Sequence, residues 1–278
     1  MMIALGVVLV VLICIFLYWQ DNGLAATNYE FSNKNIPFAF NDFKIMQISD
    51  LHNKLFGKNQ CRLIQKVRDA APDIIVITGD LIDCNRPNID AAVAFILQAV
   101  QIAPVYYVPG NHESKSGLYA QLSPQLMQAG AVVLNNQSAQ ILREGEQMTV
   151  LGVKDIEFLK RTKKSKPLDE FRTLLADVCR EKTGFSILLA HRPEYLELYA
   201  AQNIDIVFSG HAHGGQIRLP VIGGLFAPGQ GWNPKYTCGF YRQKETTLVV
   251  SRGLGNSEFP FRVFNRPEIV ILTLKTKQ

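Results

Sequence analysis

Cysteine is scarce in this sequence and is not arranged for cross-linking. The 278 residues include five cysteines, at positions 14, 61, 84, 179 and 238, and no two of them have C-x-x-C spacing. An odd number of scattered cysteines does not predict a disulfide framework, and the missing C-x-x-C pairs argue against a zinc knuckle. We expect mostly buried thiols with a packing role.

The chain also lacks a strong charge imbalance. Its 29 Lys and Arg against 24 Asp and Glu leave a formal net charge of +5. No basic groove interleaved with aromatic residues is evident, so we expect no nucleic-acid partner. The one basic run, KRTKKSK at residues 160–166, predicts a solvated loop, with binding of an acidic headgroup or nucleic acid as the alternative.

Only the N-terminus contains an apolar run long enough for a membrane. Residues 3–18 (IALGVVLVVLICIFLY) carry no charge, and the run ends in Tyr18 and Trp19, residue types typical of the membrane interface. We expect a single-pass cell-membrane anchor at residues 1–20. A cleaved signal peptide is the alternative, because residues 24–26 (LAA) are small, although no Lys or Arg precedes the run. The few basic residues downstream leave the side of the membrane open.

Beyond the anchor, residues 21–42 are polar and rich in Asn, which predicts a linker. Residues 43–278 are interpreted as one α/β domain, because apolar runs alternate with stretches of helical spacing. Continuous apolar runs predict strands covered on both faces at 43–49, 73–79, 105–110, 185–190 and 205–210. Helices are expected at 59–70, 89–101, 118–128, 168–180 and 194–202.

The middle block, residues 131–153, has strand-like runs with no long helix between them. This pattern predicts hairpins of a second sheet. The runs at 247–253 and 268–274 are expected to extend that sheet or the first one.

Histidine is scarce too, and its placement is informative. Each histidine of the chain comes just after the carboxyl end of a predicted strand: His52, His112, His191, His211 and His213. Ligands bind at that edge of an α/β sheet, because loops there carry side chains that the strands hold in place. Asp50, Asp80 and Asn111 accompany the histidines. Imidazole, carboxylate and amide groups together suit two divalent transition metals.

The ordered elements D-x-H, G-D, G-N-H-E, H and G-H-x-H, from Asp50 to His213, resemble the signature of the calcineurin-like metallophosphoesterase superfamily. The resemblance covers about residues 43–274 and implies a four-layer αββα sandwich of two mixed sheets flanked by helices. It implies an enzyme that cleaves a phosphodiester or pyrophosphate bond by in-line attack of a hydroxide bridging two divalent metal ions. Manganese, iron and zinc all suit the ligand set.

The same resemblance implies a role for each motif residue. Asp50, His52 and His213 are expected to hold one metal. Asn111, His191 and His211 are expected to hold the other, and Asp80 to bridge the two. His112 is expected to face the phosphate as a catalytic residue, and Glu113 to orient its neighbours.

Four other polar residues near the motifs have less specific expectations. Asp83 and Asp155 are predicted to be loop acids. Arg192 and Arg218 are suited either to a substrate phosphate or to local ion pairs.

A narrower resemblance concerns the substrate. The N-terminal apolar segment, GHAHGGQIRLP, YTCGFY and SRGLGNSEFPFR look like membrane-associated bacterial phosphoesterases, a group that includes enzymes cleaving UDP-2,3-diacylglucosamine. This implies a lipid-linked or membrane-proximal substrate. Residues 219–241, rich in Gly, Pro and aromatics, are expected with residues 259–261 to form an apolar lip beside the metals; a packed loop is the alternative. A nuclease of the same superfamily and a non-catalytic scaffold remain the other functional hypotheses.

Overall fold

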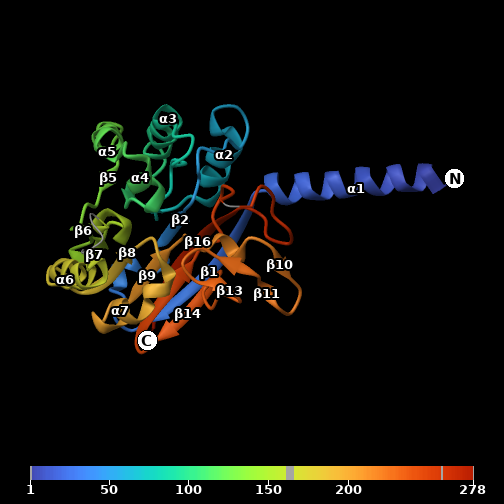
Figure 1. The fold of residues 1–278 in the computed structure, drawn as a ribbon. Coiled ribbons are helices and arrows are strands. Elements are labelled where there is room, and N and C mark those ends of the chain that lie inside the picture. The colour runs from blue at the N-terminus through green and yellow to red at the C-terminus, as the bar shows by residue number, and fades with distance from the viewer. Residues whose placement is uncertain (1, 161–165, 258, 278) are drawn as a thin grey trace.

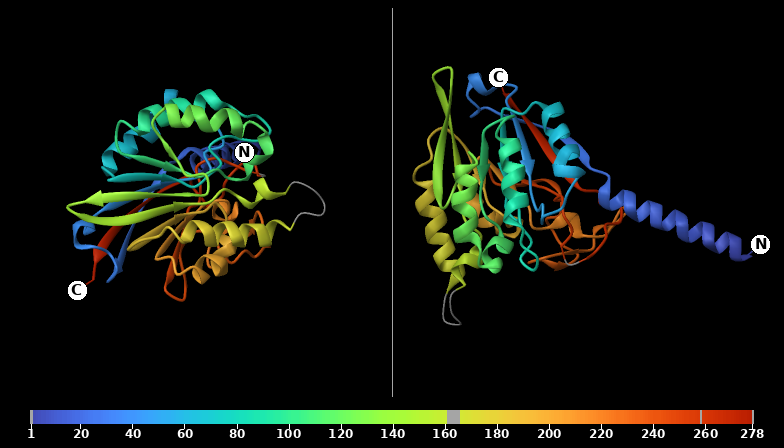
Figure 2. Two further views of the ribbon diagram at one scale, coloured as in Figure 1. Left: turned by 90° about the vertical axis from the view of Figure 1, so that its left-hand side faces the viewer. Right: turned by 90° about the horizontal axis from the view of Figure 1, so that it is seen from above.

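The protein is described by a computed structural model over residues 2–160, 166–257 and 259–277. Within these residues, two six-stranded sheets pack face to face, with helices on both outer sides (Figures 1 and 2). The expected four-layer αββα sandwich is confirmed. Residues 161–165 of the basic run lie outside the described residues, so the interpretation of that run stays a prediction.

The first sheet has the strand order β1-β16-β2-β3-β4-β5. Strands β2 to β5 are parallel, β16 is antiparallel to β2, and β1 is parallel to β16. The bounds are β1 Ala25–Asn33, β2 Lys44–Ile48, β3 Ile74–Ile77, β4 Val105–Tyr107, β5 Val132–Val133 and β16 Glu268–Thr276.

The second sheet has the order β14-β15-β9-β8-β7-β6. Its four inner strands are parallel, and the outer strands β14 and β6 join them as antiparallel hairpins. The bounds are β6 Gln137–Arg143, β7 Glu146–Gly152, β8 Phe185–Leu189, β9 Ile206–Ser209, β14 Gly239–Gln243 and β15 Thr246–Val250. Two short ribbons follow β9: β10 Arg218–Leu219 with β11 Gly223–Gly224, and β12 Phe226–Ala227 with β13 Gly231–Trp232.

Apolar side chains from the facing surfaces of the two sheets form the central layer of the core, as with Ile45 and Val76 against Ile187 and Phe208. Helices α2, α3 and α5 cover the outer face of the first sheet, and α6 and α7 cover that of the second. Because both faces of the inner strands are covered, their sequences are continuous apolar runs. The bounds are α2 Cys61–Ala70, α3 Ile89–Ala99, α4 Asn111–Ser116, α5 Tyr119–Gln128, α6 Pro167–Cys179 and α7 Leu196–Ala201.

The segment 21–42, expected to be a linker, contains strand β1 and needs correction. Strand β1 pairs with β16 along its whole length, from Ala25 opposite Glu268 to Asn33 opposite Thr276. Alternate residues face inward, and Tyr29 and Phe31 pack against the central core layer. The strand is an edge strand with one polar face, so its composition resembles that of a loop.

Two smaller expectations also differ from the structure. Val132–Val133 of the middle block pairs with β4 in the first sheet, and only the β6-β7 hairpin belongs to the second. The cysteines are not mostly buried: Cys179 is, but Cys14 and Cys61 are exposed, because one lies on the projecting helix α1 and the other begins α2.

Helix α1 (Met2–Asn22) projects from the domain (Figures 1 and 2). Among the described residues it is the one helix long and apolar enough to cross a membrane, and no residue of its most apolar stretch is buried. At 1.5 Å per residue it is about 30 Å long, the thickness of a bilayer's hydrocarbon core. Its last turns contact the domain, where Gln20 is buried and the Phe16 ring lies 5.4 Å from that of Phe264.

Candidate metal centre

The carboxyl ends of strands from both sheets meet at one edge of the sandwich and bring the expected ligands together. The loops after β2, β3, β4, β8 and β9 carry, in chain order, Asp50, His52, Asp80, Asn111, His191, His211 and His213. All seven residues are buried, with at most 8% of their surface exposed. All seven side chains therefore lie in one cluster, as the sequence predicted.

The backbone of this cluster is strained. Five of the seven residues have φ angles between 46° and 63°: Asp50, His52, Asp80, His211 and His213. Positive φ is uncommon outside glycine, and residues held in sparsely populated regions cost about 1–3 kcal/mol each. The loops thus adopt a costly conformation that places these side chains close together.

Two glycines allow the ligand loops to approach one another. A Cβ at position 110 would lie 2.2 Å from Asp80 Oδ1, and one at position 210 would lie 2.3 Å from Asp50 Oδ2. Any larger residue at either position would displace an expected ligand. The glycines of the GNHE and GHAH motifs therefore serve the packing of neighbouring carboxylates.

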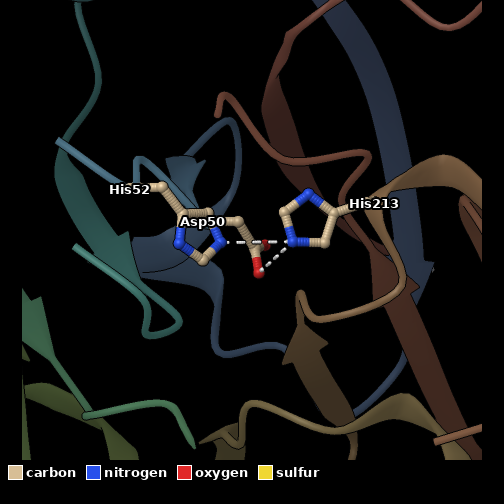
Figure 3. Close-up of side chains that lie close together, drawn as sticks. All are labelled: Asp50, His52 and His213. Carbon is tan, nitrogen blue, oxygen red and sulfur yellow. Dashed lines mark hydrogen bonds and ion pairs between the residues drawn. The ribbon is translucent and has the colours of Figure 1, made fainter. Parts of the chain in front are cut away.

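The first group of side chains consists of Asp50, His52 and His213 (Figure 3). The two Nε2 atoms of His52 and His213 are 3.2 Å apart, and His213 Nε2 is 3.5 Å from Asp50 Oδ1. Asp50 also accepts a 3.0 Å hydrogen bond from the backbone N–H of His211, which joins the loop after β2 to the loop after β9. Three ligand atoms of these types, this close together, match a cation site.

The second group is centred on His191. Its Nε2 atom lies 3.0 Å from Asn111 Oδ1 and 3.2 Å from Asp80 Oδ2. Its Nδ1 atom is 2.7 Å from the carbonyl oxygen of Thr78, so Nδ1–H donates there and Nε2 is left as the ligand atom. His211 completes the group, with a ring nitrogen within 4.8 Å of the ligand atoms of Asp80 and His191.

Asp80 lies between the two groups. The same oxygen that faces His191, Oδ2, is 3.7 Å from Nε2 of His52. Its other oxygen, Oδ1, accepts a 2.9 Å hydrogen bond from the backbone N–H of His112, which fixes the orientation of the carboxylate. The geometry therefore suits Asp80 as a carboxylate shared by two cations.

The electrostatics of the cluster favour cations. Burial lowers the pKa of His52 to about 4, and the pKa values of His211 and His213 lie well below the usual range for the same reason, so these imidazoles are neutral. Burial alone would also lower the pKa of His191, but the Asp80 carboxylate outweighs it and raises that pKa to about 10. Positive charge is thus stabilised beside Asp80, where a metal would replace the proton.

Unsatisfied polar atoms give a direct test of whether these residues fit metals. Among the described residues, the buried His211 Nε2 has no hydrogen-bond partner, and the Nε2 atoms of His52 and His213 face each other at 3.2 Å with no other hydrogen-bond partner. Leaving such atoms buried and unpaired costs about 1–3 kcal/mol each. Nitrogen and oxygen donors with free lone pairs in two adjoining groups fit a pair of divalent ions.

His112 lies at the edge of the cluster, and its ring is oriented by the backbone. The backbone N–H of Cys84 donates a 3.0 Å hydrogen bond to Nδ1 of His112, so the proton of the neutral ring resides on Nε2. The ring centroid is 4.3 Å from that of His52. His112 lines a cavity of about 420 Å³, which Asp80, Asn111 and His211 also line.

Glu113 is fully buried and accepts three backbone hydrogen bonds. Its Oε2 atom accepts from Gly110 (2.7 Å) and Asp80 (2.9 Å), and its Oε1 atom accepts from Ile82 (3.2 Å). Burial raises its pKa to about 7, with the nearby Asp80 charge as the next cause. The carboxylate joins the loop after β3 to that after β4, in line with the orienting role expected for it.

Two further positions near the cluster make contacts that the sequence did not predict. Asp83 is a loop acid as expected, accepting from the backbone of Asn85 and Arg86, but its Oδ2 atom lies 3.6 Å from His112 Nδ1. Asn265 donates from Nδ2 to the carbonyl oxygens of His213 and Gln216. The sequence GDLID placed Asp83 close to Asp80. No sequence pattern near Asn265 indicates its contact with His213, 52 residues earlier in the chain.

The arginines make local contacts. Arg192 Nε is 2.8 Å from Asp155 Oδ2, so this loop acid is buried as the ion-pair partner of Arg192, which also lines the cavity. Arg218 donates to Gly214 O and Thr237 Oγ1. Both therefore support the loops around the cluster.

Comparison with known proteins shows the family of this chain. Residues 43–215 match the family model described as calcineurin-like phosphoesterase. The chain belongs to this family. It is 31% identical over 93% of its length to YkuE, an uncharacterized metallophosphoesterase of Bacillus subtilis, and covers 88% of that protein. It is 29% identical over 84% of its length to the phosphodiesterase YaeI of Escherichia coli, of which it covers 82%.

The fold of this metallophosphoesterase also matches a solved structure. TT1561 of Thermus thermophilus superposes with a TM-score of 0.53 at 14% identity, over 76% of this chain and 90% of that one. As a family member the protein is a metal-dependent phosphoester hydrolase. Its clustered ligands indicate a dimetal centre.

Proposed function

We propose that this metallophosphoesterase cleaves a phosphodiester or pyrophosphate bond in a lipid-linked substrate at a membrane surface. The observation that carries the reaction class is the placement of Asp80 Oδ2, 3.2 Å from His191 Nε2 and 3.7 Å from His52 Nε2. One carboxylate oxygen between two ligand groups supports a shared pair of metals, the arrangement used for in-line displacement at phosphorus.

In this proposal, Asp50, His52 and His213 hold one metal, Asn111, His191 and His211 hold the other, and Asp80 contributes to both. When bound, two such divalent ions supply positive charge that activates water and stabilises the phosphoryl oxygens. The protein residues hold these ligands in fixed positions: Thr78 orients the ring of His191, and Glu113 fixes the loop that carries Asp80. Manganese, iron and zinc all suit the donor set.

His112 is proposed as the catalytic residue that contacts the substrate. Its Nδ1 atom is occupied by the backbone N–H of Cys84, so Nε2–H is the proton available to the cavity. A hydrogen bond from Nε2 to a phosphoryl or leaving oxygen would stabilise developing negative charge, and proton transfer from it would release the leaving group.

Helix α1 is proposed to be a retained single-pass membrane anchor. Its end is built into the domain: Gln20 Oε1 accepts from the backbone of Asn265, and Asp21 Oδ1 accepts from the backbone of Arg262. Cleavage near residues 24–26 would remove both contacts and leave the 262–265 loop without them. The side of the membrane on which the domain lies stays open.

The substrate is proposed to be amphiphilic. Phe226 lines the cavity, and its ring is in edge contact with those of Trp232 (5.6 Å) and Phe259 (6.4 Å). These aromatics support the expected apolar lip beside the metals, and the phosphodiesterase name of YaeI supports a diester substrate. UDP-2,3-diacylglucosamine is one molecule with the required pyrophosphate and acyl groups.

A substrate panel tests the proposal. The full-length protein in detergent micelles, reconstituted with manganese, iron or zinc, is assayed on UDP-2,3-diacylglucosamine, a glycerophosphodiester lipid, a nucleotide, nucleic acid and a small nitrophenyl diester. We expect the lipid-linked substrates to show the highest kcat/KM. A preference for nucleic acid would support the nuclease alternative, and no activity with bound metals would support a scaffold.

A further inference from the structure

The turn between β10 and β11 presents bare apolar side chains to solvent. Val221 is fully exposed and Ile222 is 63% exposed, and both lie at the tip of a ribbon whose pairs are Arg218 with Gly224 and Leu219 with Gly223. Val221 has a φ angle of 68°, which is sterically unfavourable for a β-branched residue. Exposed apolar groups on a strained turn do not stabilise the domain itself, so they need another explanation.

This ribbon is joined to the loop that contacts helix α1. The backbone N–H of Arg218 donates a 2.9 Å hydrogen bond to Val263 O, and Ile217 forms an isolated bridge with Val263. The next residue, Phe264, is 55% exposed and its ring lies against Phe16 of α1. The ribbon tip, the 261–264 loop and the end of α1 thus form one connected group.

These loops lie on the side of the domain from which α1 leaves. Figure 1 shows the β10-β11 ribbon and the red loop beside the base of α1, and the view from above in Figure 2 agrees. Phe261 adds a further half-buried aromatic ring to that side, at 37% exposure. A bilayer crossed by α1 would therefore reach the ribbon tip and the loop next.

Contacts with the domain hold the angle of α1. Arg266 stacks on the Trp19 ring at 4.7 Å, and its Nε donates to Gly23 O. Lys54 Nζ donates to Asp21 O at 2.6 Å from the loop after β2. Because residues from several loops contact the end of α1, we expect the helix and these loops to keep one orientation relative to the bilayer.

We propose that the β10-β11 tip, Val221 and Ile222, together with Phe261 and Phe264, docks into the lipid bilayer that α1 crosses. The occupant is lipid because α1, an exposed apolar helix of membrane length, contacts the same loop. In this arrangement the protein contacts the membrane through the β10-β11 tip and the 261–264 loop as well as through α1. The opening beside His52, a cavity of about 680 Å³ lined by Lys54, Asn256 and Pro260, then faces the interface.

This inference rests on the proposed anchoring by α1, and its test separates the two. The full-length protein has two tryptophans, Trp19 and Trp232. In a Trp19→Phe, Trp232→Phe background, Ile222→Trp places a single reporter at the tip. The matched control, Leu142→Trp, replaces an exposed leucine (72%) on β6, away from α1. Each variant is reconstituted into phosphatidylcholine vesicles, and quenching by acyl-brominated phosphatidylcholine is measured.

We expect fluorescence at position 222 to be lost in brominated vesicles and fluorescence at position 142 to be unchanged. Equal, weak quenching at both positions in protein that floats with the vesicles would overturn the docking proposal and favour a protein partner for this tip. Protein that does not float would overturn the anchor as well. Hydrolysis of a soluble nitrophenyl diester reports intact folding, and Val221→Trp is a second reporter should Ile222→Trp disturb it.

Discussion

The backbone N–H of Cys84 donates a 3.0 Å hydrogen bond to Nδ1 of His112. This contact distinguishes the two ring nitrogens, because Nδ1 accepts from the backbone of Cys84 and Nε2–H is left for the proposed contact with substrate. It also separates His112 from the metal ligands, although it lies within ligand distance of His52 and Asp80. The division of roles leads to a first prediction.

His112→Ala is expected to lower kcat by roughly 10²–10⁴-fold while two metals stay bound, because the residue is proposed to contact substrate and not metal. Kinetics on a nitrophenyl diester and elemental analysis of the purified variant measure the two effects. Loss of one metal from this variant would assign His112 to the ligands and contradict the proposed roles.

Asp80→Ala is expected to abolish hydrolysis and to reduce metal content, because it removes the oxygen facing both ligand groups. The matched control is Asp83→Asn, which keeps an oxygen for the backbone N–H groups of Asn85 and Arg86 and should retain both metals. Metal content by elemental analysis decides. An Asp80→Ala protein with two metals would mean that the carboxylate does not bridge.

Glu113→Gln is expected to weaken metal binding by about 10–100-fold, as for other residues that position ligands. The amide keeps a single acceptor oxygen for three backbone N–H groups, so at least one of the donors of Gly110, Asp80 and Ile82 loses its partner. Metal titration followed by activity measures the shift. Recovery of kcat at saturating metal is the signature of a positioning role, whereas a kcat that stays low would indicate direct catalysis.

Asn265→Ala is expected to weaken the metal site that His213 serves. The Asn265 side chain donates to the carbonyls of His213 and Gln216, and its backbone N–H donates to Gln20 of α1. Truncation removes this donor from both carbonyls, but the His213 carbonyl still accepts from the backbone N–H of Gln216, so the cost of about 1–3 kcal/mol applies to the Gln216 carbonyl. The expected result is a lower Tm together with metal loss from one site. Unchanged metal affinity would show that the His213 turn keeps its conformation without the Asn265 side chain.

Phe226→Ser is expected to raise KM for a lipid-linked substrate more than for a small nitrophenyl diester, because Phe226 lines the cavity with its aromatic partners. Phe38→Ser, which changes an exposed aromatic outside both lip segments, is the matched control. Equal changes of KM for both substrates would contradict the proposal that the lip binds an acyl group.

The position of the candidate metal centre in the fold could largely be predicted from the sequence. The five strands before the motifs are continuous apolar runs, so their carboxyl ends could be located and their polar residues assigned to one edge. His211 and His213, separated by Ala212, lie in different ligand groups, as the resemblance implied. Only the structure could show which oxygen of Asp80 faces both groups.

The sequence by itself predicted an α/β layered domain and, through the family resemblance, a set of candidate ligands, because local apolar patterns specify strands and the motifs directly follow them. The tertiary structure decided those features that depend on contacts between residues far apart in the sequence. Strand β1 was recognisable only through its pairing with β16, since an edge strand with one polar face resembles a loop. The attachment of α1 through Gln20 and Asn265 to the His213 turn joins residues 245 positions apart, a contact that no local pattern encodes.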